Sequence, residues 1–137
     1  MRYWLVKSEP FKYSWGTMLK DRVTYWDGVR NFQARNNLKT MKKGEQVLFY
    51  HSNEGREIVG ITEVVKEYYQ DPTTKDERWV VVDLKAKNSL KRTIDLNEIK
   101  EDPILSDMAL IKQSRLSVME IKKKHFDRII RKSNGKR

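Results

Sequence analysis

The segment 25–31 gathers side chains that suit contact with a flat polar ring, such as a nucleic-acid base. It places Trp26 close to Gly28, and Arg30 and Asn31 follow directly. Tryptophan presents a flat face for stacking, glycine lets the backbone turn freely, and the polar residues offer hydrogen bonds. Burial in the core accounts for Trp26 equally well, because tryptophan contributes a large apolar area wherever it packs. The sequence leaves both roles open.

Two further groups of residues have side chains that contact phosphate or base edges in other proteins. Arg30 and Arg35 lie five residues apart, and their guanidinium groups suit bidentate phosphate contacts. Gln113, Arg115 and Ser117 supply amide, guanidinium and hydroxyl groups at the start of an extended segment. A solvated basic face and an ordinary polar loop have the same compositions, so these alternatives remain.

The residue types and their spacing give little support for a catalytic site. The imidazole of His51 is a possible general base for Ser52, but adjacent residues on a strand point to opposite faces. Glu9 and Asp27 would form a carboxylate pair only if the fold brought them together, and nothing in the sequence indicates that. The chain has no Walker loop, G-x-G-x-x-G, H-E-x-x-H or nucleophile elbow. We therefore expect a binding protein rather than an enzyme.

The composition points to a polyanionic partner. The 137 residues include 29 Lys and Arg against 19 Asp and Glu, which gives a formal net charge of +10. This charge favours nucleic acid through counterion release and steering, although a lysine-rich surface also serves solubility. The chain has no cysteine and only two histidines, so thiolate chemistry and cysteine- or histidine-rich metal sites are excluded. We expect no cofactor and no metal.

The elements that must position these groups follow from local patterns. Alternation and enrichment in β-branched and aromatic residues predict strands at 3–7, 46–51, 57–65 and 79–87, and extended segments at 93–96 and 117–121. Helices are predicted at 14–20, at 32–41 and from about residue 122, with short helical turns over 97–107. Ser14 and Asn31 are the expected caps of the first two helices.

Some segments do not fit a regular element. Segment 69–78 contains Pro72 and mixed charges, so we expect an exposed and mobile excursion. Asn36 and Asn37 disfavour the helix interior that they occupy, which indicates a tertiary contact or a function. Residues 133–137 are expected to fray.

The order of strands and helices predicts one mixed α+β domain, residues 1–137, around a curved or barrel-like sheet. No long apolar run or leader pattern is present, so we expect no membrane span and a cytoplasmic location, or a nuclear one in a eukaryote.

Four ordered motifs resemble the EVE-domain family of the PUA-like superfamily, which also contains YTH and SRA modules. They are Y-W-L-V-K-S-E-P at 3–10, W-D-G-V-R-N-F-Q-A-R-N at 26–36, V-L-F-Y-H-S at 47–52 and Q-S-R-L-S-V at 113–118. The resemblance implies a PUA-like curved β-barrel of about five to six strands, flanked by short helices, with a base-sized pocket. It also implies nucleic-acid binding, with DNA carrying 5-methylcytosine or 5-hydroxymethylcytosine favoured and RNA possible. The family has no firmly established catalytic role.

Carried onto these motifs, the resemblance predicts a base pocket and a set of backbone contacts. The predicted pocket residues are Ser8, Glu9, Trp26, Asn31, His51, Ser52, Gln113 and Ser117. The predicted phosphate or backbone contacts are Arg30, Arg35 and Arg115. Three alternatives stay open: an RNA-binding module without preference for modified bases, a base-flipping hydrolase or glycosylase that uses His51, and an interaction protein with a vestigial pocket.

Overall fold

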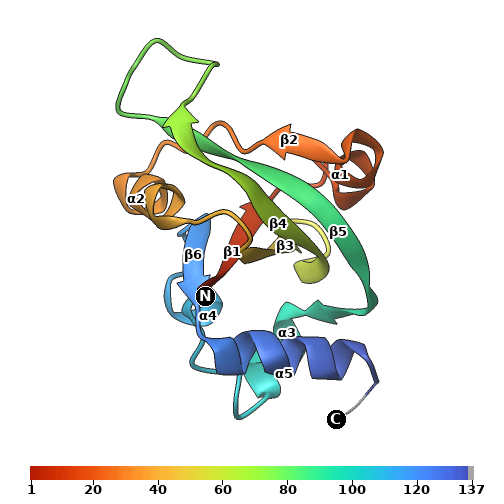
Figure 1. Cartoon of the computed structure of the whole chain (residues 1–137). Coiled ribbons are helices and arrows are strands. Elements are labelled where there is room, and N and C mark those ends of the chain that lie inside the picture. Colours follow the sequence, from red (N-terminus) through yellow and green to blue (C-terminus); the bar gives the residue numbers. More distant parts are fainter. Residues whose placement is uncertain (136–137) are drawn as a thin grey trace.

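A curved mixed sheet of six strands forms the centre of the computed structural model, which describes residues 1–135 (Figure 1). In their order across the sheet, the strands are β2 (Val23–Tyr25), β5 (Val80–Asp95), β4 (Glu57–Gln70), β3 (Gln46–His51), β1 (Tyr3–Ser8) and β6 (Val118–Ile121). Within the described residues, β1 and β3 are the only neighbouring strands that run parallel. The predicted α+β class is confirmed. The sheet is not a closed barrel, because its edge strands β2 and β6 are not paired with each other.

Two long strands give the sheet its curvature. The pairing of β4 with β5 shifts register at several points, the first between Ile58 and Gly60. Such bulges bend a strand and increase its twist. The sequence patterns predicted shorter strands, because alternation breaks at each bulge while the backbone pairing continues. The three-residue β2 was not predicted, since it is too short to show a period.

The two N-terminal helices begin at the predicted caps. α1 (Trp15–Asp21) starts where the Ser14 hydroxyl accepts a hydrogen bond from the Thr17 amide, at 3.1 Å. α2 (Phe32–Thr40) starts where the Asn31 side chain accepts one from Ala34, at 2.9 Å. These bonds satisfy amides that have no partner inside the helix. Both predicted caps are confirmed.

Helix α2 closes one side of the curved sheet, where it contacts β4, β5 and β6. Its predicted apolar face is buried, with Ala34, Leu38 and Met41 inaccessible to solvent. The Asn37 side chain donates a hydrogen bond to the Val118 carbonyl of β6, at 2.7 Å. This tertiary contact accounts for an asparagine inside the helix.

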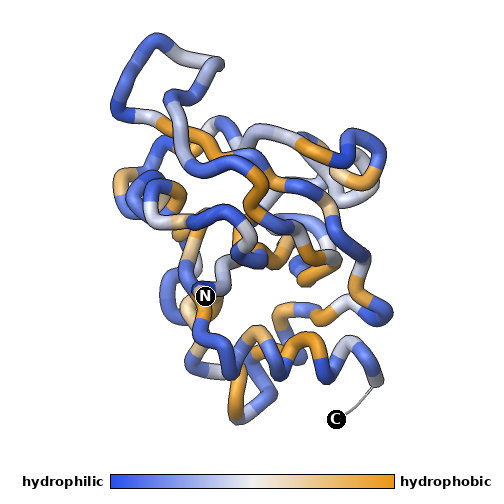
Figure 2. The backbone as a smooth tube through the Cα atoms, viewed as in Figure 1, coloured by the Kyte–Doolittle hydropathy of each residue, from blue (hydrophilic) through white to orange (hydrophobic). Residues whose placement is uncertain are grey.

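Three further helices lie at the other end of the molecule: α3 (Leu96–Glu101), α4 (Ala109–Lys112) and α5 (Lys123–Ser133). The hydropathy colours show apolar stretches in the strands and in α5, and a hydrophilic segment between β4 and β5 (Figure 2). The predicted fraying from residue 133 is wrong for Ser133, which is buried at the end of α5. Residues 136–137 lie outside the described part of the chain.

Ion pairs hold α5 to α3. The Glu98 carboxylate accepts hydrogen bonds from Arg92 and lies 3.2 Å from the Lys132 amine. These two cations outweigh the effect of partial burial and lower the pKa of Glu98 to about 2. Burial opposes ionisation of Asp102, but hydrogen bonds from Arg128 and Lys132 outweigh it and lower the pKa of Asp102 to about 2.

The ring of Trp15 packs directly on the backbone of Gly60 in β4 and beside Phe49, with ring centroids 5.1 Å apart. The Trp15 amide donates to Nε2 of His51 at 2.9 Å, and its indole N–H donates to Ser89 at 2.8 Å. Any side chain at position 60 would overlap the indole. These contacts fix α1 against the sheet.

Gly60→Ala is therefore expected to destabilise the protein by about 1–3 kcal/mol, because the new Cβ displaces Trp15 from a packed core. The matched control is Gly16→Ala in α1, where a Cβ meets only ordinary contact with Ser14 at 3.6 Å. This control should be neutral or gain up to about 1 kcal/mol from helix propensity. Urea denaturation measures both, and equal stability of the two variants would contradict the packing argument.

Acid should weaken the attachment of α5. The lowered pKa values of Glu98 and Asp102 mean that the folded state binds fewer protons in acid than the unfolded chain does. Their stabilisation is complete above about pH 4.5 and is lost as the pH falls toward 2. We expect Glu98→Gln/Asp102→Asn to lower the free energy of unfolding at neutral pH and to flatten its fall in acid. Asp127→Asn, on the exposed side of α5, should keep the wild-type slope in the same denaturation series.

Candidate functional site

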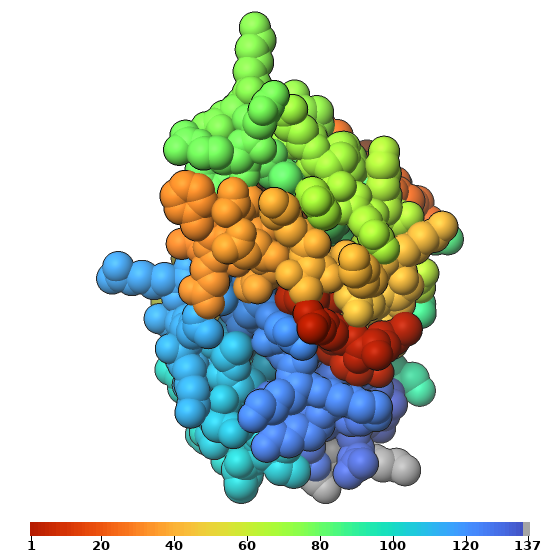
Figure 3. Space-filling model, turned by 60° about the vertical axis from the view of Figure 1, so that its left-hand side comes forward, coloured from red at the N-terminus to blue at the C-terminus, as the bar shows by residue number. Residues whose placement is uncertain are grey.

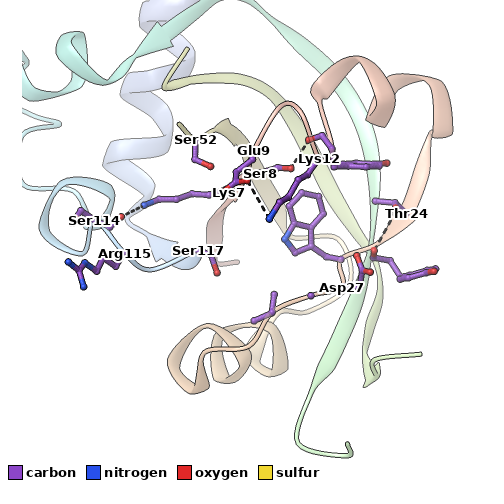
Figure 4. Close-up of a pocket in the computed structure, with 15 residues that line it drawn as sticks. Lys7, Ser8, Glu9, Lys12, Thr24, Asp27, Ser52, Ser114, Arg115 and Ser117 are labelled. Carbon is purple, nitrogen blue, oxygen red and sulfur yellow. Dashed lines mark hydrogen bonds and ion pairs between the residues drawn. The ribbon is translucent and has the colours of Figure 1, made fainter. Parts of the chain in front are cut away.

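An open pocket of about 610 Å³ lies beside the end of β1, and segments far apart in the sequence line it (Figure 4). Its lining residues are Lys7, Ser8, Glu9, Lys12, Tyr13, Thr24, Tyr25, Trp26, Asp27, Gly28, Val29, Ser52, Ser114, Arg115 and Ser117. Five of the eight predicted base-pocket residues are among them: Ser8, Glu9, Trp26, Ser52 and Ser117. Arg115 is the predicted backbone contact that also lines the pocket.

The pairing of β1 brings three serines to this place. β1 lies between β3 and β6, and the Ser52 amide donates to the Ser8 carbonyl at 2.9 Å. On the other side, the Lys7 amide donates to the Ser117 carbonyl, also at 2.9 Å. One wall of the pocket is therefore built on the paired ends of strands.

Trp26 belongs to both the core and the pocket. Only 8% of its surface is exposed, and its amide donates to the Val82 carbonyl of β5 at 2.9 Å. Its ring meets Phe49 and Tyr13 edge to face, with centroids 5.5 and 6.1 Å apart. Burial, together with Asp21 nearby, raises the pKa of Tyr13 to about 12, so this phenol stays neutral. Trp26 therefore packs in the core, and its remaining surface lines the pocket.

The pocket combines cations with carboxylates. Lys7 donates to the Ser114 carbonyl at 2.7 Å, and burial lowers the pKa of its amine (Figure 4). The Glu9 carboxylate accepts from Asn53 at 2.9 Å and lies 3.5 Å from the Lys12 amine. Asp27 lines the same pocket on an exposed stretch of chain. Glu9 and Asp27 thus line the same cavity, although no local pattern indicates that they share a site.

The buried carboxylate of Asp71 holds the wall that carries Trp26. One oxygen accepts from the Gly28 amide at 3.2 Å and from Arg30 at 3.0 Å, and the other accepts from the amide and hydroxyl of Thr73. Burial opposes ionisation of Asp71, but these donors outweigh it and keep its pKa below the usual value. The expectation of an exposed excursion at 69–78 is wrong at Asp71, whose surface is fully buried.

Two predicted pocket residues support the backbone instead of lining the pocket. His51 accepts the Trp15 amide on Nε2, and burial lowers the pKa of its imidazole. Asn31 caps α2. Neither belongs to the pocket lining.

The remaining predicted residues lie beyond the pocket rim. Gln113 accepts a hydrogen bond from Gln33 at 2.9 Å and borders a shallow adjoining cavity of about 340 Å³. Arg30 is paired with Asp71, and Arg35 donates to the Arg78 carbonyl at 3.1 Å. These three residues are separated from the pocket because each is engaged by a neighbouring segment.

Several lining residues were not predicted. Lys7, Asp27 and Ser114 lie inside three of the motifs, so their position in the sequence was the available signal. Lys12 and Tyr13 sit in a loop, whose position depends on contacts that no local pattern encodes.

The curved six-stranded sheet with its flanking short helices has a PUA-like fold. The fold is similar to that of the YTH domain of Zygosaccharomyces rouxii MRB1 protein, solved in complex with N6-methyladenosine RNA. The TM-score is 0.59 at 14% identity, over 99% of this chain and 88% of that one, and the likeness concerns the fold alone.

The chain belongs to the EVE domain family, whose model matches residues 2–132. Thymocyte nuclear protein 1 of Gallus gallus is 35% identical over 93% of this chain and 67% of its own length. Human THYN1, solved in complex with DNA containing 5-methylcytosine, is 33% identical with a TM-score of 0.90 over 97% of this chain and 98% of that chain. Protein Atu2648 of Agrobacterium tumefaciens is 40% identical with a TM-score of 0.94, over 97% of this chain and 93% of that chain. The predicted family is confirmed.

Two kinds of feature are absent from residues 1–135. No helix there is long and apolar enough to cross a membrane. No cluster of three or more His, Cys, Asp or Glu side chains in that range is arranged to hold a metal ion.

Asp71→Asn is expected to loosen the Trp26 wall, because an amide cannot accept from all of the donors that surround Asp71. We expect a loss of about 1–3 kcal/mol in the free energy of unfolding, measured by urea denaturation. Asp76→Asn is the matched control, since Asp76 pairs with Arg78 on the exposed part of the same segment, and its change should be small. Equal losses in the two variants would show that Asp71 has no special structural role.

Proposed function

We propose that the pocket holds a single base of a nucleic acid, with a modified cytosine of DNA, 5-methylcytosine or 5-hydroxymethylcytosine, as its ligand. The observation that carries the proposal is the relative solved with 5-methylcytosine DNA, which shares the fold over nearly the whole of this chain. The pocket supports it with an aromatic wall, hydroxyl groups and carboxylates in one open cavity. In this function, the chain binds its ligand and does not transform it.

The carboxylates of the pocket favour cytosine. Cytosine presents an amino group at position 4, and Asp or Glu accepts a hydrogen bond from such a group. Thymine carries the same 5-methyl group but has an acceptor at position 4, which a carboxylate would repel. Asp27 is the better candidate for this contact, because Glu9 is already engaged by Asn53 and Lys12.

The apolar part of the pocket suits the base ring and its substituent. Trp26 and Val29 lie within two residues of Asp27 in the chain and line the same cavity. Stacking on an aromatic side chain contributes about 1–3 kcal/mol per base, which offsets the few kcal/mol needed to unstack a base from a duplex. Lys12 and Arg115 at the pocket would pair with the flanking phosphates.

A base-flipping hydrolase or glycosylase is the less favoured function. That alternative used His51 as the general base, but Nε2 of His51 accepts the Trp15 amide and the ring lies outside the pocket lining. An RNA-binding module without preference for modified bases differs from our proposal only in ligand, so competition between ligands separates the two.

We expect the wild-type protein to bind an oligonucleotide with one 5-methylcytosine or 5-hydroxymethylcytosine more tightly than the unmodified DNA or the matching RNA. Asp27→Asn should reduce the preference for the modified cytosine over thymine at the same position by about 5- to 100-fold, because the amide no longer supplies a charged acceptor. Fluorescence anisotropy competition measures both quantities.

The control is Asp127→Asn, which makes the same charge change on α5 at the other end of the molecule. It should leave the preference intact. Equal affinity of the wild-type protein for modified DNA, unmodified DNA and RNA would refute the proposal. Trp26→Ala is a poorer test, because removing this buried ring costs about 3–5 kcal/mol of stability on its own.

A further inference from the structure

A pair of stacked aromatic rings lies outside the core and beyond the pocket. Phe32 begins α2, Trp79 immediately precedes β5, and their ring centroids are 5.2 Å apart with planes inclined by 27°. Phe32 keeps 51% of its surface exposed, and neither ring belongs to the hydrophobic core. The fold therefore leaves about half of the Phe32 surface in water, beside a half-buried Trp79.

Three guanidinium groups surround these rings. Arg30 and Arg78 lie over Trp79, at 5.6 and 5.7 Å from the ring centroid, and Arg35 lies over Phe32 at 5.1 Å. We call these five residues the Arg–aromatic cluster. Arg30 and Arg78 are paired with aspartates, whereas Arg35 donates to the Asn36 amide oxygen and the Arg78 carbonyl. The charge of Arg35 is thus not offset by the groups that it contacts.

Hydrogen bonds link the Arg–aromatic cluster to the pocket in two places. Gly28 lines the pocket, and the same oxygen of Asp71 that accepts from Gly28 also accepts from Arg30. The second link is a hydrogen bond from Gln33 of α2 to Gln113, beside the shallow cavity that shares Arg115 with the pocket.

One of these links starts on α2. Figure 3 shows α2, in orange, in contact with the green segment between β4 and β5 above it and with light-blue chain below it. A strand that leaves the pocket beside Arg115 can therefore pass the shallow cavity and reach α2, which carries Phe32 and Arg35.

We propose that the Arg–aromatic cluster is a second contact surface for nucleic acid, which holds the strand next to the nucleotide whose base enters the pocket; this inference rests on the proposed function of the pocket. A flanking base packs on the ring of Phe32 and the adjacent guanidinium plane, and Arg35 donates to a phosphate. Every base has a flat face and every phosphate the same charge, so these contacts do not distinguish modified from unmodified cytosine. The cluster contributes affinity, and the pocket contributes selectivity.

The test compares two double variants that remove the same kinds of groups. Phe32→Ala/Arg35→Ala removes one aromatic ring and one cation from the cluster. Tyr68→Ala/Lys39→Ala removes another exposed cation–aromatic pair, in which the Lys39 amine lies 5.3 Å from the centroid of the Tyr68 ring. Lys39 is in the last turn of α2, and neither residue lines the cavities described above. Binding of each protein to the modified and the unmodified oligonucleotide is measured by fluorescence anisotropy over a series of salt concentrations.

We expect the cluster variant to bind both oligonucleotides about tenfold more weakly, with the ratio of the two affinities unchanged. Its salt dependence should fall by about one unit of slope, because one phosphate contact is lost. The control variant should stay within about twofold of the wild type. Phe32→Leu, which keeps apolar contact with Trp79 but lacks the flat ring, should reproduce part of the loss and serves if the double variant does not fold.

Two results would overturn the inference. The first is wild-type affinity in the folded cluster variant or in Phe32→Leu. The second is an equal loss of affinity in the control variant, which would indicate only a general effect of charge. The proposed function of the pocket fails separately. If the wild type shows no preference for the modified oligonucleotide but the cluster variant still loses affinity, the pocket is not a modified-base reader and the cluster remains a strand-binding surface.

Discussion

The buried carboxylate of Asp71 is the constraint on which the pocket depends. A charge removed from water is tolerated only where several donors replace its hydration, and Asp71 obtains them from two segments more than forty residues apart in sequence. Gly28 supplies one of these donors from a backbone with φ of +76°, a conformation that suits glycine. Since Trp26 lies two residues before Gly28, the position of the aromatic wall follows from how this charge is satisfied.

The two sides of the pocket are consequently built by different means. The side with Ser8, Ser52 and Ser117 rests on backbone hydrogen bonds at the ends of β1 and β3, which pack over a buried core. The side with Trp26 and Asp27 is a loop, and loops gain a fixed shape only through contacts of this kind. Arg30 shares the same anchor, so a ligand that touches both the pocket and the outer face meets one preformed surface rather than two independent ones.

The sequence predicted those features that depend on contacts between residues close together in the chain. The caps Ser14 and Asn31 depend on bonds within a few residues, and both were found, as was the apolar face of α2. The contact of Trp15 with Gly60 and the burial of Asp71 depend on distant segments, and no periodicity reveals them. The motifs located the pocket but could not separate residues that line it from residues that support it. His51 and Asn31 lie within motifs, yet their side chains serve the backbone.

The net charge of +10 was the first sign of a nucleic-acid partner, and it is also the least specific. The pocket keeps a similar excess of cations, with Lys7, Lys12 and Arg115 in its lining, but it also places the carboxylates of Glu9 and Asp27 in the same cavity. Carboxylates disfavour a bare phosphate in the cavity but accept from the amino group of a base, while cations around them favour the flanking phosphates. In the proposed function, the basic surface attracts any nucleic acid to the protein, and the few acidic groups determine which part of the nucleotide enters. On that proposal, selectivity depends on the carboxylates, the less numerous charge.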